Sequence, residues 1–528
     1  MPNHSTDVLV VGAGPTGLML TLWLARRGVG VRIIDKTNAP GTTSRALVMH
    51  ARTLEFYRAL GLADEAIGQG LKFPALNLWA RGKHKGHVVL GDIGQDQSPF
   101  PFMLILAQDK QEQLLIEAIA KLGVKVERET ELVGFEDRGT GVTARLKAPT
   151  GEETCECSWL AGCDGTHSTV RETLKLGFPG GTYAHMFYVA DIHGRGPAIN
   201  AELNVAVDES DFLAVFPLPG EGNARFIGTV KREAENAHSS SSARPGTGHN
   251  SKPDVPCPPS NGRGSKFSWN DVNAKILSRM QLEVERVNWF STYHVHHRVA
   301  GSFRLSRVFL LGDAAHVHSP VGAQGMNTGL GDAVNLAWKL AMVIAGRAPE
   351  RLLDTYEPER IAFARRLVAT TDRAFTFVTR DGSIARFMRL NVVPLLLPAI
   401  MRMDAARRFL FCTLSQIEIE YRSSALSSGR AGNVRGGDRL PWVPDNFAPL
   451  ASLEWQVHVY GRARDALADA CRSRGLALHA FAWSHATARA GLARDALYLI
   501  RPDGYVAIAD AAGDPLALEN YLDKEGFV

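Results

Sequence analysis

A glycine-rich turn near the start of the chain restricts the fold more than any other feature. A strand is predicted at residues 7–11 and a helix at residues 18–27, and Gly12, Gly14 and Gly17 lie between them in the spacing G-x-G-x-x-G. The first two glycines allow a tight turn and the close approach of a pyrophosphate, and Gly17 lets the helix pack closely on the strand. The sequence therefore predicts a Rossmann-like dinucleotide-binding domain of the α/β class.

An acidic residue follows at the distance that this fingerprint requires. A second strand is predicted at residues 31–34, and Asp35 directly after it is placed to accept hydrogen bonds from ribose hydroxyls. Strand, turn, helix and acid occur together, which favours dinucleotide binding over a purely structural turn. FAD and NAD both fit these features. Residues 41–47 and two later segments, which a dehydrogenase does not need, favour FAD.

The later of the two segments, residues 309–341, begins with an apolar strand that ends in Gly312 and Asp313. A turn-rich stretch follows, and a long apolar helix is predicted from about Asn327. A strand, a loop and a helix N-terminus in this order place backbone N–H groups against an anionic or electron-rich ligand. The turn-rich stretch contains Pro320, Gly322, Gly325 and Met326.

The earlier segment is a predicted strand around residues 158–161 that leads into Asp164 and Gly165, followed by a Ser/Thr-capped helix that contains Arg171. This is again a helix-terminus arrangement. Taken alone, a capped turn without a ligand explains the segment better than a binding site does. Its meaning therefore depends on the other two segments.

The composition is that of a multidomain globular protein with a small-molecule partner. A chain of 528 residues predicts about three domains, and 59 basic against 55 acidic residues without a basic block argue against nucleic acid as a partner. Six scattered cysteines favour a reducing cytoplasm, and no signal peptide is predicted. The longest apolar window, residues 391–403, is too short to span a membrane, so no membrane association is expected. No metal site is expected, because His294 with His296, and Cys155 with Cys157, lack further ligands nearby.

Strand and helix patterns divide the chain into four parts. Residues 1–180 and 295–375 are predicted to form a discontinuous FAD-binding domain, with some strands in 72–100 that belong to the substrate domain. Residues 181–294 are predicted to form a mostly antiparallel substrate-binding sheet that carries a mobile insertion, rich in Ser, Pro and Gly, at residues 235–265. Linking helices at 376–404 and a C-terminal domain at 405–528 follow.

The three segments, in this order, resemble the motifs of the single-component (class A) flavoprotein aromatic hydroxylases, a phenol hydroxylase-like monooxygenase family. The resemblance covers about residues 5–375. It implies an enzyme that uses non-covalent FAD, NAD(P)H and O₂ to hydroxylate a phenolic or polyketide-type aromatic substrate through a C4a-hydroperoxyflavin. Only one full G-x-G-x-x-G is present, so NAD(P)H is expected to bind transiently. A flavin-dependent oxidase or dehydrogenase, and a non-catalytic flavin-binding protein, stay open as alternatives.

The resemblance also assigns cofactor contacts. Asp35 is expected to bind the adenosine ribose, Arg45 and Gln108 to approach the flavin side of the pyrophosphate and the ribityl chain, and Asp313 to hold oxygens next to them. Residues 320–327 are expected to lie along the isoalloxazine with their N–H groups aimed at its N1–C2=O edge. The expected cofactor-binding residues are Gly12, Gly14, Pro15, Thr16, Gly17, Asp35, Lys36, Arg45, Gln108, Asp164, Gly165, Gly312, Asp313, Pro320, Gly322, Gly325, Met326 and Asn327.

The substrate pocket is expected between the antiparallel sheet and residues 320–327. Phe187, Phe212, Phe216 and Phe226 are candidate lining residues, although sheet aromatics more often belong to the core. The catalytic candidates are Pro320 in the loop and His185, Tyr188 and Arg225 on the sheet. The chemistry requires a polar base in an apolar pocket, and the sequence does not single out one of these residues for it.

Residues 405–528 resemble the thioredoxin-like tail of the larger members of this family. A hairpin is predicted around residues 497–507, where two β-rich runs flank a Pro-Asp-Gly turn. The two active cysteines of thioredoxin are missing, and Cys471 lies alone in a predicted helix. A structural or oligomerisation role, including a homodimer, is therefore expected in place of a redox role.

Overall fold

The computed structural model describes residues 3–41, 46–91, 94–208, 212–230, 267–319, 321–379 and 386–527. Four of the sequence expectations fall outside this part of the chain. They concern Arg45, Pro320, the side chain of His185 and the insertion at 235–265.

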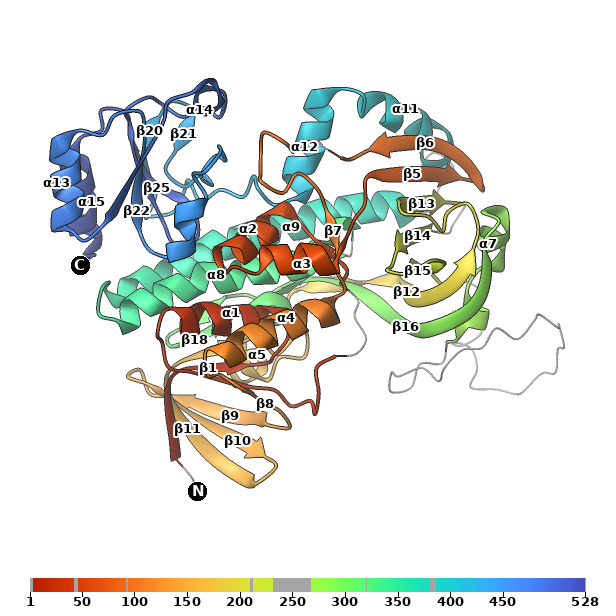
Figure 1. The fold of residues 1–528 in the computed structure, drawn as a ribbon. Helices are drawn as coiled ribbons and strands as arrows, with labels where there is room; N and C mark the ends of the chain where they lie inside the picture. Colours follow the sequence, from red (N-terminus) through yellow and green to blue (C-terminus); the bar gives the residue numbers. More distant parts are fainter. Residues whose placement is uncertain are drawn as a thin grey trace.

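A parallel sheet forms the first domain, as the Rossmann-like prediction requires (Figure 1). Its strand order is β18-β11-β1-β2-β8, with every neighbouring pair parallel. The bounds are β1 (Asn3–Val11), β2 (Val31–Ile34), β8 (Val126–Glu127), β11 (Gly151–Gly162) and β18 (Val308–Leu310). Antiparallel strands β9 (Glu131–Asp137), β10 (Val142–Ala148) and β17 (Arg304–Leu305) extend the sheet. Helix α1 (Pro15–Arg26) starts three residues before the predicted helix, because proline fits the first helical turn.

The second sheet is mostly antiparallel, also as predicted. Its order is β19-β16-β12-β15-β14-β13-β5-β6, and of these pairs only β13 and β5 run parallel. The bounds are β5 (Ala75–Ala80), β6 (Lys83–Val89), β12 (Gly180–Arg195), β13 (Leu203–Val207), β14 (Phe212–Pro217), β15 (Asn223–Thr229), β16 (Glu283–Val299) and β19 (His316–Val317).

Two predictions in this region were inaccurate. The helix predicted at 270–280 is only α7 (Ala274–Arg279), and β16 begins ten residues before the predicted strand at 293–299. The first half of β16 is rich in charge, which hid it from a pattern of apolar residues. Those charges pair across the sheet instead, as Glu283 does with Arg195.

Two long helices, α8 (Gly325–Ile344) and α9 (Tyr356–Thr379), cross the middle of the molecule between the parallel sheet and the C-terminal domain (Figure 1). The other helices are α2 (Ala51–Ala59), α3 (Ala63–Gln69), α4 (Gln108–Lys121), α5 (Thr169–Thr173), α11 (Val393–Ile400) and α12 (Asp404–Leu414). A small sheet joins β3 (Val48–Met49), β7 (Leu104–Ile105) and β4 (Leu71–Lys72). Among the described residues, no helix has both the length and the apolar character that crossing a membrane requires.

The C-terminal domain has its own sheet with the order β21-β20-β25-β24-β22-β23. The chain runs β20 (Ser428–Ala431), β21 (Val434–Arg435), β22 (Gln456–Tyr460), α13 (Asp465–Ser473), β23 (Ala477–Phe481), α14 (His485–Arg489), β24 (Leu497–Ile500), β25 (Val506–Asp510) and α15 (Pro515–Glu525). Strands β22 and β23 are parallel, and β24 is antiparallel to both of its neighbours. This order supports the thioredoxin-like interpretation of the domain.

Candidate functional site

All three sequence motifs meet at one edge of the parallel sheet. Four neighbouring strands, β18, β11, β1 and β2, run parallel, so their carboxyl ends lie side by side. Gly312 follows the first, Asp164 the second, Gly12 the third and Asp35 the fourth. The carboxyl edge of an open parallel sheet is where such folds bind their ligands.

A cavity of about 270 Å³ opens at this edge beside the glycine-rich turn. Gly12 has a φ of +103°, and a Cβ there would lie 2.4 Å from the carbonyl oxygen of Cys163. A Cβ on Gly14 would meet no atom within 4 Å, so the turn leaves space for a group that approaches the backbone. The predicted residues that line the cavity are Gly12, Gly14, Asp35, Lys36, Asp164 and Gly165.

Two carboxylates lie in this cavity with different partners. Asp35 accepts hydrogen bonds from the backbone N–H groups of Ala13 (2.7 Å) and Thr37 (2.8 Å). Asp164 accepts one from the N–H of Val170 at 3.1 Å, but its Oδ1 is buried and has no partner among the described residues. Burial raises the pKa of this carboxyl. An unpaired buried acceptor beside open glycines fits a ligand that donates hydroxyl protons, as the ribose and ribityl groups of FAD do.

Arg171 connects two of the motifs. Its guanidinium donates to the carbonyl of Thr166 (2.8 Å) and to the carbonyl of Ala314 (2.9 Å), and it lies over the ring of Phe178. The segment that begins at Asp164 is thereby tied to the turn after β18. The sequence placed Arg171 in a capped helix but gave no sign of this contact.

Thr16 has a packing role that its position in the fingerprint did not reveal. A Cβ on Gly312 would lie 2.6 Å from Thr16 Oγ1, and one on Gly329 would lie 2.4 Å from the same atom. Thr16 therefore lies between two glycines, which lets α1 pack closely on α8. Gly17 contacts the turn itself, since a Cβ there would lie 2.0 Å from the carbonyl oxygen of Gly12. Asp313, next to Gly312, has an exposed side chain.

The first turn of α8 offers its N–H groups without a side-chain cap. Asn327 does not point to a ligand, because its side chain is fully used inside the protein. Its Oδ1 accepts from the N–H of His50 (3.0 Å) and the hydroxyl of Thr53 (2.7 Å), and its Nδ2 donates to the carbonyls of Val48 and Ala323. The side chain thus fixes the loop, and the backbone N–H groups at the helix start stay the predicted contact for the flavin edge.

Several other predicted cofactor residues lie around this edge. Pro15 begins α1, and Gly325 and Met326 begin α8. Gly322 has a φ of +78° in the turn that precedes α8. Gln108 is the first residue of α4, and its amide donates to Glu112 at 2.8 Å. Their contacts with the cofactor stay predictions.

Tyr188 and Arg225, two of the three sheet residues proposed for catalysis, lie on opposite faces. Tyr188 is 1% exposed, stacks on Phe290 at 5.8 Å and packs in a core that includes Phe226 and α7. Arg225 is on the other face, where it forms a bidentate ion pair with Asp191 (2.6 and 2.8 Å). The placement of Tyr188 does not support a catalytic role for it.

The face of Arg225 is the one that looks toward the α8 loop. Phe216 pairs with Arg225 across the strands, and cross-strand partners share a face. Phe216 belongs to an apolar cluster that also contains Ala323, just before α8. Of the predicted lining residues, Phe216 therefore lies on the expected side, whereas Phe226 belongs to the core behind the sheet.

Two histidines beside the loop were not selected from the sequence. His318 Nδ1 lies 2.8 Å from the carbonyl of Ser319, which can only accept, so Nδ1 carries the proton. Its Nε2 is then an acceptor that lies buried near Gly325 and has no hydrogen-bond partner in the part of the chain that the structure describes. His50 in turn donates from Nε2 to the carbonyl of Gly322 at 2.9 Å. Burial lowers the pKa of each to about 4, which keeps both neutral. In the sequence, the pattern H-x-H at residues 316–318, just before Pro320, could have drawn attention to His318.

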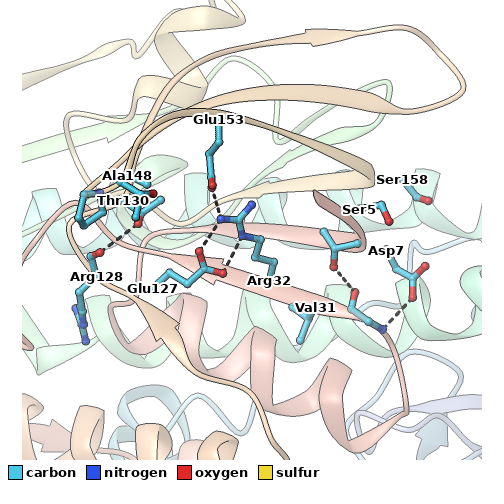
Figure 2. Close-up of a pocket in the computed structure, with 14 residues that line it drawn as sticks. Ser5, Asp7, Val31, Arg32, Glu127, Arg128, Thr130, Ala148, Glu153 and Ser158 are labelled. Atoms are coloured by element: carbon cyan, nitrogen blue, oxygen red, sulfur yellow. Dashed lines mark hydrogen bonds and ion pairs between the residues drawn. The ribbon is translucent and has the colours of Figure 1, made fainter. Parts of the chain in front are cut away.

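A larger hollow, about 1070 Å³, lies beside the first halves of β1 and β2 (Figure 2). Arg32 lies in it, paired with Glu127 (2.6 Å) and with Glu153. Asp7 and Arg128 also line it, so carboxylates outnumber guanidiniums. This charge is wrong for a pyrophosphate, and the cavity at the glycine-rich turn is the better dinucleotide site despite its smaller volume.

Comparison with known proteins agrees with this geometry. The model of the FAD binding domain family matches residues 5–371. A 6-methylpretetramide 4-monooxygenase of Streptomyces rimosus is 34% identical over 435 residues, which are 81% of this chain and 72% of that protein. The solved anhydrotetracycline hydroxylase from Streptomyces rimosus matches with a TM-score of 0.76 and 26% identity over 99% of both chains. An aklavinone-11 hydroxylase, solved with FAD and aklavinone, matches with a TM-score of 0.76 and 25% identity over 99% of both chains.

Proposed function

Since the chain belongs to the FAD binding domain family and is an FAD-dependent aromatic monooxygenase, we propose that its substrate is a phenol of several fused rings. The observation that carries this proposal is the apolar cluster between the antiparallel sheet and the start of α8. Relatives that act on tetracycline-type compounds and aklavinone support it. Bound FAD supplies the chemistry that activates O₂. The protein binds the substrate, orients it and excludes water from it.

The apolar cluster draws on four parts of the chain that are distant in sequence. Members of the cluster on the sheet side are Leu203, Phe216 and Leu218. Val48 and Ile105 come from the small sheet, Leu397 from α11, Met401 from the residue after α11, and Ala323 from the α8 loop. An apolar cluster of this kind suits contact with a large apolar ring system, because burying the ring system displaces water from both surfaces. It also keeps water from the place where oxygen is transferred.

At the start of α8, we assign acceptance of a hydrogen bond from the substrate hydroxyl to His318. Its Nδ1–H is fixed on the carbonyl of Ser319, so Nε2 is the nitrogen that can accept a hydrogen bond. Among the described residues that nitrogen has no hydrogen-bond partner, and it lies beside Gly325, at the helix start predicted to face the flavin edge. Burial keeps this imidazole neutral and in one tautomer, so Nε2 can accept a hydrogen bond from the phenol hydroxyl and orient it.

The reduction of bound flavin tests this function. Phenols of one ring and of three or four fused rings are each mixed with the flavoprotein before NADH or NADPH is added. The proposal expects that only the fused-ring compounds accelerate bleaching of the flavin. Acceleration by single-ring phenols alone would contradict the substrate class, while bleaching that is equally fast without any phenol would favour an oxidase or dehydrogenase. Flavin that stays oxidised with every compound would favour a non-catalytic protein.

A further inference from the structure

The tip of the hairpin between β24 and β25 is buried among the helices of the FAD-binding domain. Arg501 is fully buried and donates two hydrogen bonds to Glu359 of α9, at 2.8 and 3.0 Å. Asp503 accepts from Arg501 and from the indole N–H of Trp338 on α8, the latter at 3.0 Å. The C-terminal domain thus contacts both long helices through buried charges.

Glu359 also binds two side chains of α8. Its carboxylate accepts from the amide of Asn335 (2.6 Å) and the ammonium of Lys339 (2.8 Å), and the hydroxyl of Ser424 completes its shell at 2.6 Å. Removing one partner from such a buried group leaves a charge uncompensated, which is costly. The arrangement of α8 and α9 is therefore fixed by groups from the C-terminal part of the chain.

Arg360, the next residue on α9, binds the N-terminal part of α8, the end of the helix that is predicted to face the flavin. It donates to Asp332 (2.6 Å), to the hydroxyl of Tyr421 (2.8 Å) and to the carbonyl of Thr328 in the first turn of α8 (3.0 Å). The ring of Tyr421 packs against the ring of Tyr505, which follows the buried hairpin tip, with their centroids 4.4 Å apart and their planes tilted by 38°.

Asp332 connects Arg360 to the turn at Gly312, one of the predicted cofactor-binding motifs. Its other oxygen accepts from the N–H of Gly312 (3.0 Å) and from Nε2 of His316 (2.7 Å), so it holds the turn after β18 in place. A second contact reaches the helix start, because Gln416 donates to the hydroxyl of Thr328 at 2.9 Å. The turn at Gly312 and the first turn of α8 are both held by residues that connect to the C-terminal domain.

We propose that the C-terminal domain positions the flavin-binding ends of α8 and of the Gly312 turn, with Tyr421 and Arg501 as positioning residues that act through Arg360 and Glu359. This role goes beyond the substrate assignment and rests only on FAD binding. It gives the domain a task that needs no redox cysteines. Loss of one of these connected hydrogen bonds loosens both the Gly312 turn and the first turn of α8, the two backbone segments that are predicted to face the cofactor.

The test compares two matched substitutions in the full-length chain. Tyr421→Phe removes the hydroxyl that accepts from Arg360. Tyr460→Phe, in the core of the C-terminal domain, removes an equally buried hydroxyl that accepts from Asn446 and touches neither α8 nor α9. FAD is titrated into each deflavinated variant, the visible spectrum of the bound flavin is recorded, and the Tm of each FAD-free form is measured.

The expected result is an FAD dissociation constant raised about tenfold in Tyr421→Phe, with a shifted flavin spectrum, and little changed in Tyr460→Phe. Equal effects in the two variants, or no effect in Tyr421→Phe, overturn the proposal. If Tyr421→Phe does not fold, Gln416→Met, which loses the bond to Thr328, is titrated in its place with the same two outcomes. Because no substrate is present, the result is independent of the fused-ring phenol proposal.

Discussion

The two ends of the proposed flavin site, its nucleotide end and its ring end, are built in different ways. The nucleotide end, around Gly12, Asp35 and Asp164, is formed by the ends of adjacent strands and by backbone contacts between neighbours in the sheet. The ring end, around Gly312 and the start of α8, depends on a buried set of charges that draws on α9 and on the C-terminal domain.

This difference predicts different responses to change. The nucleotide end depends on space beside the backbone, so adding atoms there is harmful. The ring end depends on paired charges with almost no exposure, so removing one partner is harmful. The following predictions test this contrast.

The largest effect is expected at the nucleotide end from Gly12→Ala. The new Cβ would collide with the carbonyl of Cys163, and the φ of +103° is strained for alanine. FAD affinity should fall by at least about a hundredfold. Gly139→Ala is the control, since Gly139 also has a positive φ but nothing within 4 Å of a Cβ. Similar FAD affinity in both variants would show that space at Gly12 is unimportant.

At the ring end, Arg360→Met leaves Asp332 buried without its guanidinium partner. The free energy of unfolding should fall by about 3–5 kcal/mol, the cost of breaking a buried pair, as measured by urea denaturation. Arg195→Met removes an ion pair at the surface and should leave the midpoint unchanged. A midpoint in Arg360→Met equal to that of the parent would refute the view that buried charges hold this end.

Acid should weaken the ring end through His50. Its pKa is lowered to about 4 by burial, below the ordinary value of 6.5, so the unfolded chain binds the proton first as the pH falls. The stability that neutral His50 provides is present above pH 6.5 and is lost between pH 6.5 and 4, by up to about 3 kcal/mol. His50→Gln should make the free energy of unfolding, measured by urea denaturation, depend less on pH over this range, and the exposed His294→Gln should not. If the pH dependence in His50→Gln equals that of the parent protein, protonation of His50 is not its cause.

The smallest effect separates the two faces of the antiparallel sheet. Arg225→Lys loses the bidentate contact with Asp191 on the face toward α8, and KM for the aromatic substrate should rise about fivefold. Tyr188→Phe alters the opposite face and should leave both kcat and KM within about twofold. If Tyr188→Phe lowers kcat as a catalytic residue would, the assignment of the faces is wrong.

The nucleotide end could be predicted from the sequence because its information is local. Spacing gave Gly12 and Asp35, whereas the strand order of the structure shows that these residues and the other motifs share one edge of the sheet. The ring end could be located but not explained. Asp332, Arg360 and Tyr421 are polar residues in helical or loop patterns that look exposed, and only the packing of distant segments shows that they are buried.

The two sheet candidates show a similar limit. Strand periodicity puts Tyr188 and Asp191 on opposite faces of β12, but the periodicity does not say which face looks toward α8. That choice is made by contacts of the sheet with the α8 loop and α11, which lie more than a hundred residues away. His318 escaped selection because its open nitrogen becomes visible only once the partner of the other nitrogen is known.

The most direct test of the central claim is the origin of the oxygen in the product. The flavoprotein is supplied with NADH or NADPH, ¹⁸O₂ and a fused-ring phenol, and the product is analysed by mass spectrometry. A monooxygenase is predicted to yield a hydroxylated product that carries one ¹⁸O atom. A product whose added oxygen comes from water, or consumption of O₂ that yields only hydrogen peroxide with every such phenol, would contradict the account.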